Sequence, residues 1–504
     1  MPGTTQEAAP NHDQGGLHKV ISWFDSRLGL SYDLLRPAPQ YAINPFYWLG
    51  ALAVVAFVIQ GVTGVIMMLF YVPSPTQAYP STQYIFQQVN YGRFLETVHL
   101  YTAYAMIMLA FMHMMRGYFV SVHKRPREMM WVVGMAMGFV TLGFGFTGYL
   151  LPWTIISKSA TDVGIGMIGA LPPPISSFLS FLIVGAGGDA MELLRFYDLH
   201  VVVLPAVLLI LLVAKMYMLE AHGISEPSTG SSPIPEQKKK VIPIFPDVSL
   251  YLFELAALFG AAMLLISVIF PLNLPPQYSP QAAAQYTAQP DWYFLWIYQI
   301  LKISVFEGAG LPVALSAVTL IFIVTFLLPF IDRGRTRKAS DRPVYVTLGA
   351  IFVTEIVVLA YWGLVTPGRV ISNEQAALVL GGTALAVALI SLASYKILFR
   401  GLQGGGSAAK KVSPLRSMRS ASMWTAGSFV LLLGLGTLSI GSTIGTIVDL
   451  IMQGPSLGSL ESLVLSLSGL SLMIVGTVYL LYRLDLGRGT IRRRIRAFEV
   501  GWKG

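Results

Sequence analysis

Long runs of apolar residues alternate with short polar segments along this chain, and their lengths predict membrane-spanning helices. A helix rises 1.5 Å per residue, so about 20 apolar residues cross the roughly 30 Å hydrocarbon layer of a bilayer. Ten such runs occur, at about 46–71, 95–120, 131–151, 197–220, 248–270, 312–331, 344–365, 373–398, 422–446 and 459–482. The pattern predicts an all-α membrane protein with about ten transmembrane helices. An amphipathic stretch, residues 20–35, predicts a further helix on the membrane surface.

The composition supports this class and narrows the chemistry. Of the 504 residues, 54% are hydrophobic and only 12% are charged, with a mean hydropathy of +0.64. The first forty residues are polar, so we expect no cleavable signal peptide. The chain contains no cysteine, which excludes disulfides, cysteine-ligated iron–sulfur clusters and thioether-attached haem on this chain.

The basic residues predict how the chain is oriented. All but five of the 34 lysines and arginines fall in loops or helix ends on one side of the predicted spans. The five on the other side are Arg93, Lys158, Arg195, Lys302 and Arg369. By the positive-inside rule, both termini lie in the cytoplasm of a multi-pass plasma-membrane protein. The net charge of +9 therefore needs no nucleic-acid partner to explain it.

The spans and loops predict five regions. Residues 1–45 form a cytoplasmic segment, 46–222 a four-helix bundle, 223–400 a C-terminal domain, 401–421 a linker, and 422–504 two extra helices with a basic tail. Two long, weakly charged segments, 152–195 and 271–311, lie on the outer side. Loops of this length in compact proteins are usually functional.

Three histidines in the bundle predict cofactor binding. His99 and His113 lie fourteen residues apart on one helix, which is roughly 21 Å and close to four turns, so both point to the same side. His200, at the outer end of the fourth predicted span, lies at the depth of His99. Histidine is rare inside membranes, and two imidazoles at one depth are the usual axial ligands of a haem.

Four glycines repeat the interval of the histidines. Gly50 and Gly64 lie fourteen apart on the first span, and Gly134 and Gly148 lie fourteen apart on the third. A flat macrocycle between helices requires backbone without Cβ at the height of each ring. Membrane helices also use glycine for packing, but two pairs at the histidine interval favour a haem-binding bundle.

A series of motifs along the chain resembles the cytochrome b subunit of quinol-oxidising bc-type complexes. NPFYWLG, KRPREMMWVVG, FTGYLLPW, LLRFYDLH and HGISEP occur in the order of that family, and PDWYFLWIYQILK resembles its Pro-Glu-Trp-Tyr quinol-site motif. The resemblance covers roughly residues 20–370. It implies two stacked haems in the bundle and two quinone pockets; we expect b-type haem, with a-type haem as the alternative. It also implies a homodimer and a Rieske iron–sulfur partner. Quinol would give one electron to the Rieske protein and one across the membrane through the haems.

The resemblance places the fourth haem ligand at Lys215. The family has a histidine there, fifteen residues after His200, so the inner haem would be held by His113 and Lys215. Lysine ligates iron only as the neutral amine. The alternative is that Lys215 extends to the membrane surface, while the haem is absent or takes Met216 or Met218.

The resemblance also implies further site residues. Where the family has an arginine that serves a haem propionate, this chain has Glu96, so we expect Arg93, Arg116 or Arg195 to serve instead. In the quinol motif, here Pro290, Asp291, Trp292 and Tyr293, Asp291 replaces glutamate and would accept a quinol proton, with Tyr293 sharing the hydrogen bond. The alternative role of Asp291 is to cap the loop. The candidates for the inner quinone pocket are Asp247, His222 and Asp33, and the alternative is that each is a plain surface residue.

Three functions are candidates on this basis. The first is the quinol-oxidising cytochrome b described above. The second is a cytochrome b built into a terminal quinol-oxidase assembly, as in archaeal variants, with variant haems and with extra helices that dock cytochrome or oxidase subunits. The third is a polytopic transporter, which predicts discontinuous helices and related halves, and the sequence shows neither.

Overall fold

The computed structural model describes residues 37–185, 187–226, 241–334, 336–337 and 341–395. Several predictions therefore lie outside the described residues, namely the surface helix 20–35, Asp33, the linker 401–421 and the last two spans.

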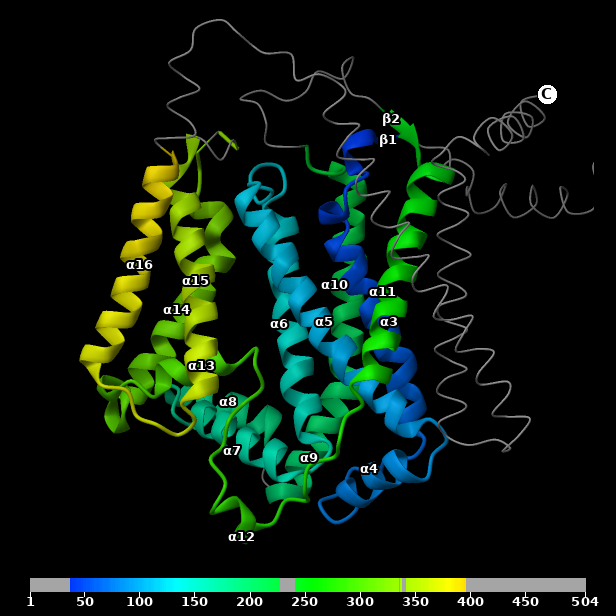
Figure 1. Cartoon of the computed structure of the whole chain (residues 1–504), viewed down its shortest axis with the longest axis vertical. Coiled ribbons are helices and arrows are strands. Elements are labelled where there is room, and N and C mark those ends of the chain that lie inside the picture. The colour runs from blue at the N-terminus through cyan, green and yellow to red at the C-terminus, as the bar shows by residue number, and fades with distance from the viewer. Residues whose placement is uncertain (1–36, 186, 227–240, 335, 338–340, 396–504) are drawn as a thin grey trace, which may run out of the picture.

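Helices dominate the described part of the chain (Figure 1), and they confirm the predicted all-α membrane class. Within it, seven helical stretches are long and apolar enough to cross a membrane. They contain α3 (Leu49–Met68), α5 (Gly92–Phe119), α6 (Glu128–Leu150), α10 (Leu204–His222), α11 (Ser249–Ile269), α14 (Leu311–Ile331) and α15 (Pro343–Val365). The eighth predicted span is α16 (Asn373–Tyr395), whose apolar part, Asn373–Leu389, is shorter. These helices match the first eight predicted spans to within a few residues, except that α10 begins seven residues after the predicted start at 197 because the turn Leu199–Val203 is π-helical.

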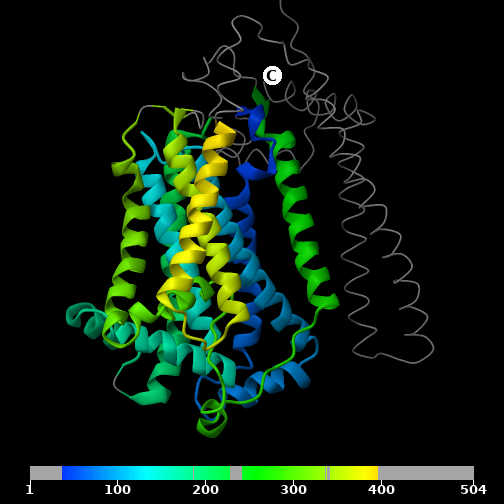
Figure 2. The ribbon, with the colours of Figure 1, turned by 60° about the vertical axis from the view of Figure 1, so that its left-hand side comes forward.

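Helices α3, α5, α6 and α10 form the four-helix bundle (Figures 1 and 2). Helix α3 packs along α5, and α6 packs against both α5 and α10. Ala56, Met106 and Leu208 form a buried core cluster, against which Met137 of α6 packs. Met106 lies midway between His99 and His113, so this apolar cluster separates the two histidine levels.

The remaining long helices surround the bundle. Helix α11 packs on α5 and α3, and α14 packs on α6. Helices α15 and α16 pack together beside α13 (Leu295–Leu301). Strand β1 (Pro37–Pro39) and the C-terminal end of α16 lie at the same end of the helices in Figure 1, which agrees with an even number of passes between them.

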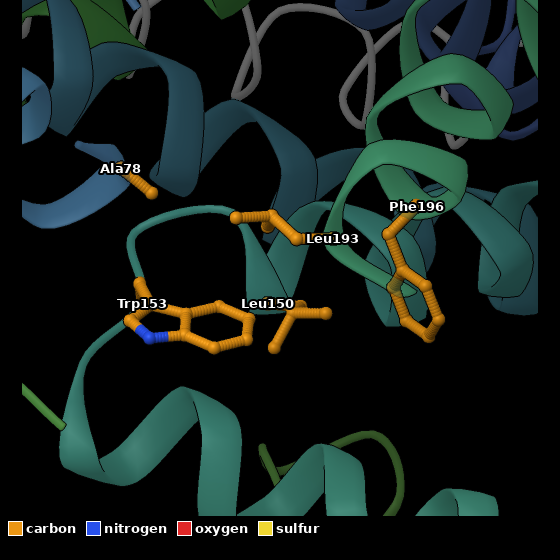
Figure 3. Packing of buried hydrophobic residues seen from close by; sticks show 5 residues of the cluster. All are labelled: Ala78, Leu150, Trp153, Leu193 and Phe196. Carbon is orange, nitrogen blue, oxygen red and sulfur yellow. The ribbon is translucent and has the colours of Figure 1, made fainter. Parts of the chain in front are cut away.

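Short helices cover the end of the bundle opposite to strand β1 (Figure 1). We call this end the α8 end. They are α4 (Ala78–Gln87), α7 (Ile155–Gly169), α8 (Pro173–Ile183), α9 (Gly188–Asp198) and α12 (Pro280–Ala283), with 3-10 turns at Ser304–Phe306 and Gly308–Gly310. Figure 3 shows the cluster that joins them to α6. Its members, Ala78, Leu150, Trp153, Leu193 and Phe196, are all buried.

The other end, the strand end, carries a small two-stranded sheet. Strand β1 (Pro37–Pro39) pairs antiparallel with β2 (Val241–Pro243), and Ala38 lies opposite Ile242. Turns of 3-10 helix at Gln40–Ala42 and Pro45–Tyr47 lead into α3, and a π-helical turn at Ile244–Val248 leads into α11.

A buried ion cluster at the strand end joins the two halves of the described chain. Asp332, at the end of α14, accepts from His123 at 2.9 Å and pairs with Lys124 at 3.0 Å and with Arg342. All four side chains are buried. Burial alone would raise the pKa of Asp332, but the hydrogen bonds from His123 and Lys124 hold it below its ordinary value. The sequence places Lys124 and Arg342 in loops or at helix ends, and it did not predict this cluster.

Candidate functional site

Two histidines face each other near the α8 end of the bundle. His99 comes from α5, and His200 comes from the π-helical turn Leu199–Val203, which joins α9 to α10. Their ring centroids are 6.4 Å apart, and the rings are inclined at 60°. Single π-helical turns within longer helices are frequent at functional sites. The predicted pairing of His99 with His200 at one depth is therefore present in the structure.

Threonine hydroxyls orient both rings. Nδ1 of His99 lies 2.8 Å from Oγ1 of Thr63, whose hydroxyl proton is directed to the Ile59 carbonyl at 2.7 Å. Nδ1 of His200 lies 3.1 Å from Oγ1 of Thr147, which donates to the Gly143 carbonyl at 2.8 Å. Because each hydroxyl already donates elsewhere, it accepts from Nδ1–H of the ring. Each Nε2 is then the unprotonated nitrogen, which is the atom that binds a metal.

Each of these histidines lies against one of the predicted glycines. A Cβ built on Gly64 would lie 3.4 Å from Cε1 of His99, and one built on Gly148 would lie 2.5 Å from Cε1 of His200. The first distance is an ordinary contact, whereas the second is shorter than real Cβ atoms show. Gly148 is thus required by the position of His200.

The second level, toward the strand end, has the same arrangement with lysine in place of one histidine. A Cβ on Gly50 would lie 3.1 Å from Cε1 of His113, and a Cβ on Gly134 would lie 2.9 Å from Nζ of Lys215. Nζ of Lys215 donates to the backbone carbonyl of Met130. All four predicted glycines therefore contact one of the four predicted ligands, one to one.

Three observations bear on what the second level holds. Nδ1 of His113 is buried and has no hydrogen-bond partner among the described residues. Met216, one of the alternative ligands, is 49% exposed and so does not turn into the bundle as Lys215 does. Within the described chain, no group of three or more histidine, cysteine or acidic side chains is placed to bind a metal ion. Two pairs of side chains that can bind iron, each beside a glycine, would fit a flat macrocycle that supplies the other metal-binding nitrogens.

Sequence reasoning missed the residues that support the outer pair. Thr63 and Thr147 each directly precede a glycine of the fourteen-residue pattern, as Thr63-Gly64 and Thr147-Gly148. That repeated dipeptide was the available signal. Gln60, which donates to the carbonyl of His99 at 2.5 Å, had no such signal.

The quinol-motif residues lie in the connection between α12 and α13. The carboxylate Oδ2 of Asp291 accepts from the hydroxyl of Tyr104 on α5 at 2.7 Å, and Oδ1 accepts from the backbone N–H of Trp292 at 3.2 Å. Tyr104 is five residues after His99, about 7.5 Å along the helix axis. The motif is therefore within a short distance of the outer histidine level.

Aromatic rings surround Tyr104, the donor to this carboxylate. The ring of Tyr104 lies 6.1 Å from that of Trp292 and 6.3 Å from that of Tyr293. Tyr293 is buried against Gly145, where a Cβ would lie 2.9 Å from its hydroxyl oxygen. Burial raises the pKa of Asp291 above its ordinary value. Burial, and then the charge of Asp291, raises the pKa of Tyr293, so its hydroxyl remains a donor. Tyr104 and Gly145 were not predicted.

Backbone contacts fix the segment that precedes α12 against the segment that precedes α7. The N–H of Tyr278 donates to the carbonyl of Trp153 at 3.1 Å, and the N–H of Ile155 donates to the carbonyl of Pro276 at 2.9 Å. Thr154 between them caps α7 by a reciprocal hydrogen-bond pair with Ser157. The two predicted outer segments, 152–195 and 271–311, are thus joined to each other.

The three predicted propionate arginines contact protein groups in the structure. Arg93 donates to the Leu272 carbonyl at 2.7 Å and to Asn273 at 2.9 Å. Arg195 donates to backbone carbonyls of α8. The guanidinium of Arg116 lies 3.9 Å from the ring centroid of Tyr47. Their role toward propionates stays a prediction.

Two of the three predicted inner-pocket residues, His222 and Asp247, lie at the strand end. His222 is the last residue of α10, and its Nδ1 contacts the carbonyl of Met218 at 2.9 Å. Asp247 lies in the π-helical turn before α11. Arg127 joins this region to α6 by donating to the carbonyl of His222 at 2.8 Å.

Comparison with known proteins agrees with this arrangement. The family model described as "Cytochrome b(N-terminal)/b6/petB" matches residues 104–280, and that described as "Cytochrome b(C-terminal)/b6/petD" matches residues 281–380. A cytochrome bc complex cytochrome b subunit of Chlorobaculum thiosulfatiphilum is 32% identical over 352 residues, covering 68% of this chain and 80% of that protein. Cytochrome b of Sulfolobus acidocaldarius is 28% identical over 378 residues, covering 69% and 66%.

A solved structure has the same fold. A chain of a hyperthermophilic respiratory Complex III is 25% identical, with a TM-score of 0.61, and the match covers 75% of this chain and 98% of that one. These matches show that the chain belongs to the cytochrome b family.

Proposed function

We propose that this chain is the quinol-oxidising, electron-conducting subunit of a membrane bc-type complex, and that it holds two haems. His99 and His200 would hold one haem near the α8 end, and His113 and Lys215 would hold the other near the strand end. The observation that carries the proposal is the one-to-one contact of these four ligands with Gly64, Gly148, Gly50 and Gly134.

Lys215 can serve as a ligand with the geometry it has. A neutral amine has one lone pair and two hydrogens, so Nζ can bind iron while donating to the carbonyl of Met130. Its position over Gly134 supports this assignment over Met216. When bound, the haems supply two one-electron redox centres at different depths in the membrane.

Quinol oxidation is assigned to the Asp291 region. In its ionised form the carboxylate accepts a proton from a quinol hydroxyl, and its raised pKa makes it a stronger base than an exposed aspartate. Tyr104 and Tyr293 position the carboxylate and the substrate. Pro290 and Trp292 complete the turn and the aromatic wall. Asp247 and His222 remain the proposed residues of a second quinone pocket, and Arg116 the nearest proposed propionate partner at the second level.

The orientation and partners follow from the same proposal. The positive-inside rule makes the α8 end the outer side of the plasma membrane and the strand end the cytoplasmic side. The electron acceptor would be a Rieske iron–sulfur protein, within a homodimeric complex. Because the chain belongs to the cytochrome b family, the transporter alternative is disfavoured. One observation favours an oxidase-type assembly as the second candidate, since the chain continues to residue 504 whereas the family matches end at 380.

Optical spectroscopy of the purified full-length chain in its complex tests the proposal. We expect a reduced-minus-oxidised spectrum of two haems per chain, with two separate midpoint potentials. Pyridine haemochrome analysis distinguishes b-type haem from the a-type haem of an oxidase variant. A colourless chain, or one haem per chain at the outer level, would overturn the two-haem proposal.

A further inference from the structure

One acidic side chain lies near the middle of a membrane-spanning helix, and the proposed function does not use it. Glu355 follows Pro343, the first residue of α15, by twelve residues and precedes Val365, the last, by ten. At 1.5 Å per residue, about 15–18 Å of helix separates it from each end. It is the only acidic or basic residue of α15. A charge at this depth in a membrane is costly, so such a residue requires a partner or a function.

No cation is placed to neutralise this carboxyl group. Glu355 forms no ion pair with any other described residue. Helix α16, which packs along α15, contains one charged residue, Glu374 in its first turn. Helix α13, which also packs against α15, contains none, and Lys302 directly after it donates to the carbonyl of Thr366, eleven residues from Glu355. Helix α5 meets α15 through aromatic rings near Gly349.

The polar group that contacts Glu355 is the hydroxyl of Thr383 on α16. Oε1 of Glu355 lies 2.6 Å from Oγ1 of Thr383. The same Oγ1 lies 2.8 Å from the carbonyl oxygen of Val379 and 3.1 Å from that of Leu380. A hydroxyl group has a single proton and two lone pairs. Thr383 therefore cannot donate fully to its own helix and to Glu355 at the same time.

Other threonines in the spanning helices indicate where this proton lies. Thr141, Thr319 and Thr325 each donate to the carbonyl four residues earlier, at 2.9, 2.7 and 2.7 Å. Threonines inside helices commonly bond to their own backbone in this way. The same assignment for Thr383 directs its proton to Val379 and leaves Oγ1 as an acceptor. The hydrogen in the 2.6 Å contact then belongs to the carboxyl group.

The second carboxyl oxygen agrees with this assignment. Oε2 of Glu355 is buried and has no hydrogen-bond partner among the described residues. An ionised carboxylate shares its charge between both oxygens, and burying it without a cation or donors is costly. A protonated acid leaves only an uncharged carbonyl oxygen unpaired, and its O–H has an acceptor in Oγ1 of Thr383.

From these contacts we infer that Glu355 is a neutral carboxylic acid whose O–H donates to Thr383 and thereby holds α16 in register on α15. Among the described residues, this is the single side-chain hydrogen bond between the two helices. At the α8 end, α16 is positioned by backbone contacts of the segment before it. The N–H of Ser304 donates to the carbonyl of Ile371 at 2.8 Å, and the N–H of Ile371 donates to that of Lys302 at 2.8 Å. The inference is independent of what the four-helix bundle binds.

Infrared difference spectroscopy of the full-length chain in its complex, at neutral pH, tests the protonation state. The carbonyl stretching band of a protonated carboxyl group is separate from the bands of carboxylates and of the backbone. We expect Glu355→Gln to lose one protonated-carboxyl band. Glu374→Gln, which removes the exposed acid of α16, is the control and should leave that band in place. If Glu355→Gln kept the full protonated-carboxyl intensity and lost carboxylate intensity instead, Glu355 would be ionised and the inference would be overturned.

Substitutions of Thr383 test the hydrogen bond and do not require Glu355→Gln to assemble. Thr383→Val removes Oγ1, so we expect the protonated-carboxyl band to shift and the thermal unfolding midpoint of the complex to fall. Thr383→Ser keeps the hydroxyl and should change neither. Thr319→Val, which removes a hydroxyl bonded to the Leu315 carbonyl of its own helix, is the control for losing a threonine in a span. An unshifted band in Thr383→Val, or a fall in midpoint no larger than that of Thr319→Val, would overturn the assigned hydrogen bond.

Discussion

A methyl group placed on Gly148 of α6 would lie 2.5 Å from Cε1 of His200. The two residues lie on different helices, and no side chain other than hydrogen fits between them. The same relationship, less tight, joins Gly50 to His113. These glycines are thus determined by the imidazole that each one faces, and helix packing alone does not explain them.

The first prediction concerns Gly148→Ala. The added Cβ must displace the His200 ring, and a shift of about 1 Å in a ligand is sufficient to weaken a metal site. We expect at least a tenfold loss of outer-haem affinity. It is measured as haem content per chain and as the absorbance change of the outer haem in a redox titration. The inner haem should be retained.

Gly138→Ala on the same helix is the matched control, because nothing lies within 4 Å of its Cβ position. It should leave both haems unchanged. Gly64→Ala should also be mild, since its Cβ would make an ordinary 3.4 Å contact. If Gly138→Ala lost as much haem as Gly148→Ala, the glycines would serve packing and not the ligands.

The second prediction concerns the threonines that orient the outer ligands. Thr147→Val preserves shape but removes the acceptor for Nδ1–H of His200, which leaves that N–H unpaired in a buried site. We expect outer-haem affinity to fall roughly 10- to 100-fold, and its midpoint potential to shift, while the inner haem is unaffected. Equilibrium haem titration of the apo-complex and potentiometry measure both quantities.

Thr141→Val supplies the control for this substitution. Thr141 is equally buried on α6 and bonds to the carbonyl of Met137 at 2.9 Å, but it contacts neither histidine. An outer haem that responds equally to both substitutions would show that the helix, and not the ring orientation, is what Thr147 maintains.

The third prediction concerns Lys215→Met. Removing the amine over Gly134 should change the spectrum and midpoint potential of the inner haem alone, because His99 and His200 lie at the other level. The measurement is low-temperature optical and electron paramagnetic resonance spectroscopy of both haems. Met216→Leu, at the neighbouring exposed position, should change neither. Unchanged spectra and potentials of both haems in Lys215→Met would remove Lys215 from the ligand set.

Much of the fold was predictable because each span is a long apolar run. Eight of the predicted spans correspond to helices of the described chain, and the paired positions of histidines and glycines follow from helical geometry. The prediction that His99 and His200 share one depth follows from the directions in which their two helices cross the membrane. The short helices α7, α8 and α9 were not predicted, since their weak polarity resembles that of an irregular loop.

The supporting residues were harder to find for a physical reason. A threonine in a membrane helix commonly bonds to its own backbone, as Thr141 does, so Thr63 and Thr147 have no distinct sequence signal until the histidines are placed. Tyr104 belongs to an apolar helix, and only the tertiary fold brings it to Asp291 from 187 positions away. The Asp332 cluster likewise joins segments that are distant in sequence.

The fourth prediction concerns Asp332→Asn. The substitution leaves Lys124 and Arg342 buried beside each other without the carboxylate, and breaking a buried ion pair in this way costs about 3–5 kcal/mol. We expect a clear loss of thermal stability of the detergent-solubilised complex. Since the pKa of Asp332 is lowered in the folded state, its contribution is present above the ordinary aspartate pKa and lost only as pH falls through the folded value.

Asp341→Asn is the control for this effect, because Asp341 lies nearby but is exposed. Exposed acidic groups contribute about 0–1 kcal/mol, so its midpoint of unfolding should change little. Equal destabilisation by the two substitutions would contradict the special role of the buried carboxylate.

The last prediction concerns Asp291→Asn and the pH dependence of quinol oxidation. An amide cannot accept the quinol proton, so we expect the rate of quinol-dependent reduction of the complex's acceptor to fall roughly 10²- to 10⁴-fold. In the unsubstituted protein the ionised carboxylate is the active form. Because burial raises its pKa, the rate should rise with pH through a midpoint above that of an ordinary aspartate.

Asp291→Asn should abolish this acid limb of the pH profile, whereas Asp291→Glu, which restores a carboxylate, should retain it. Haem content must stay at two per chain in both variants, so that the change is assigned to proton transfer. An acid limb that persists in Asp291→Asn would mean that another group accepts the proton, and Asp291 would then only cap the loop that contains Trp292.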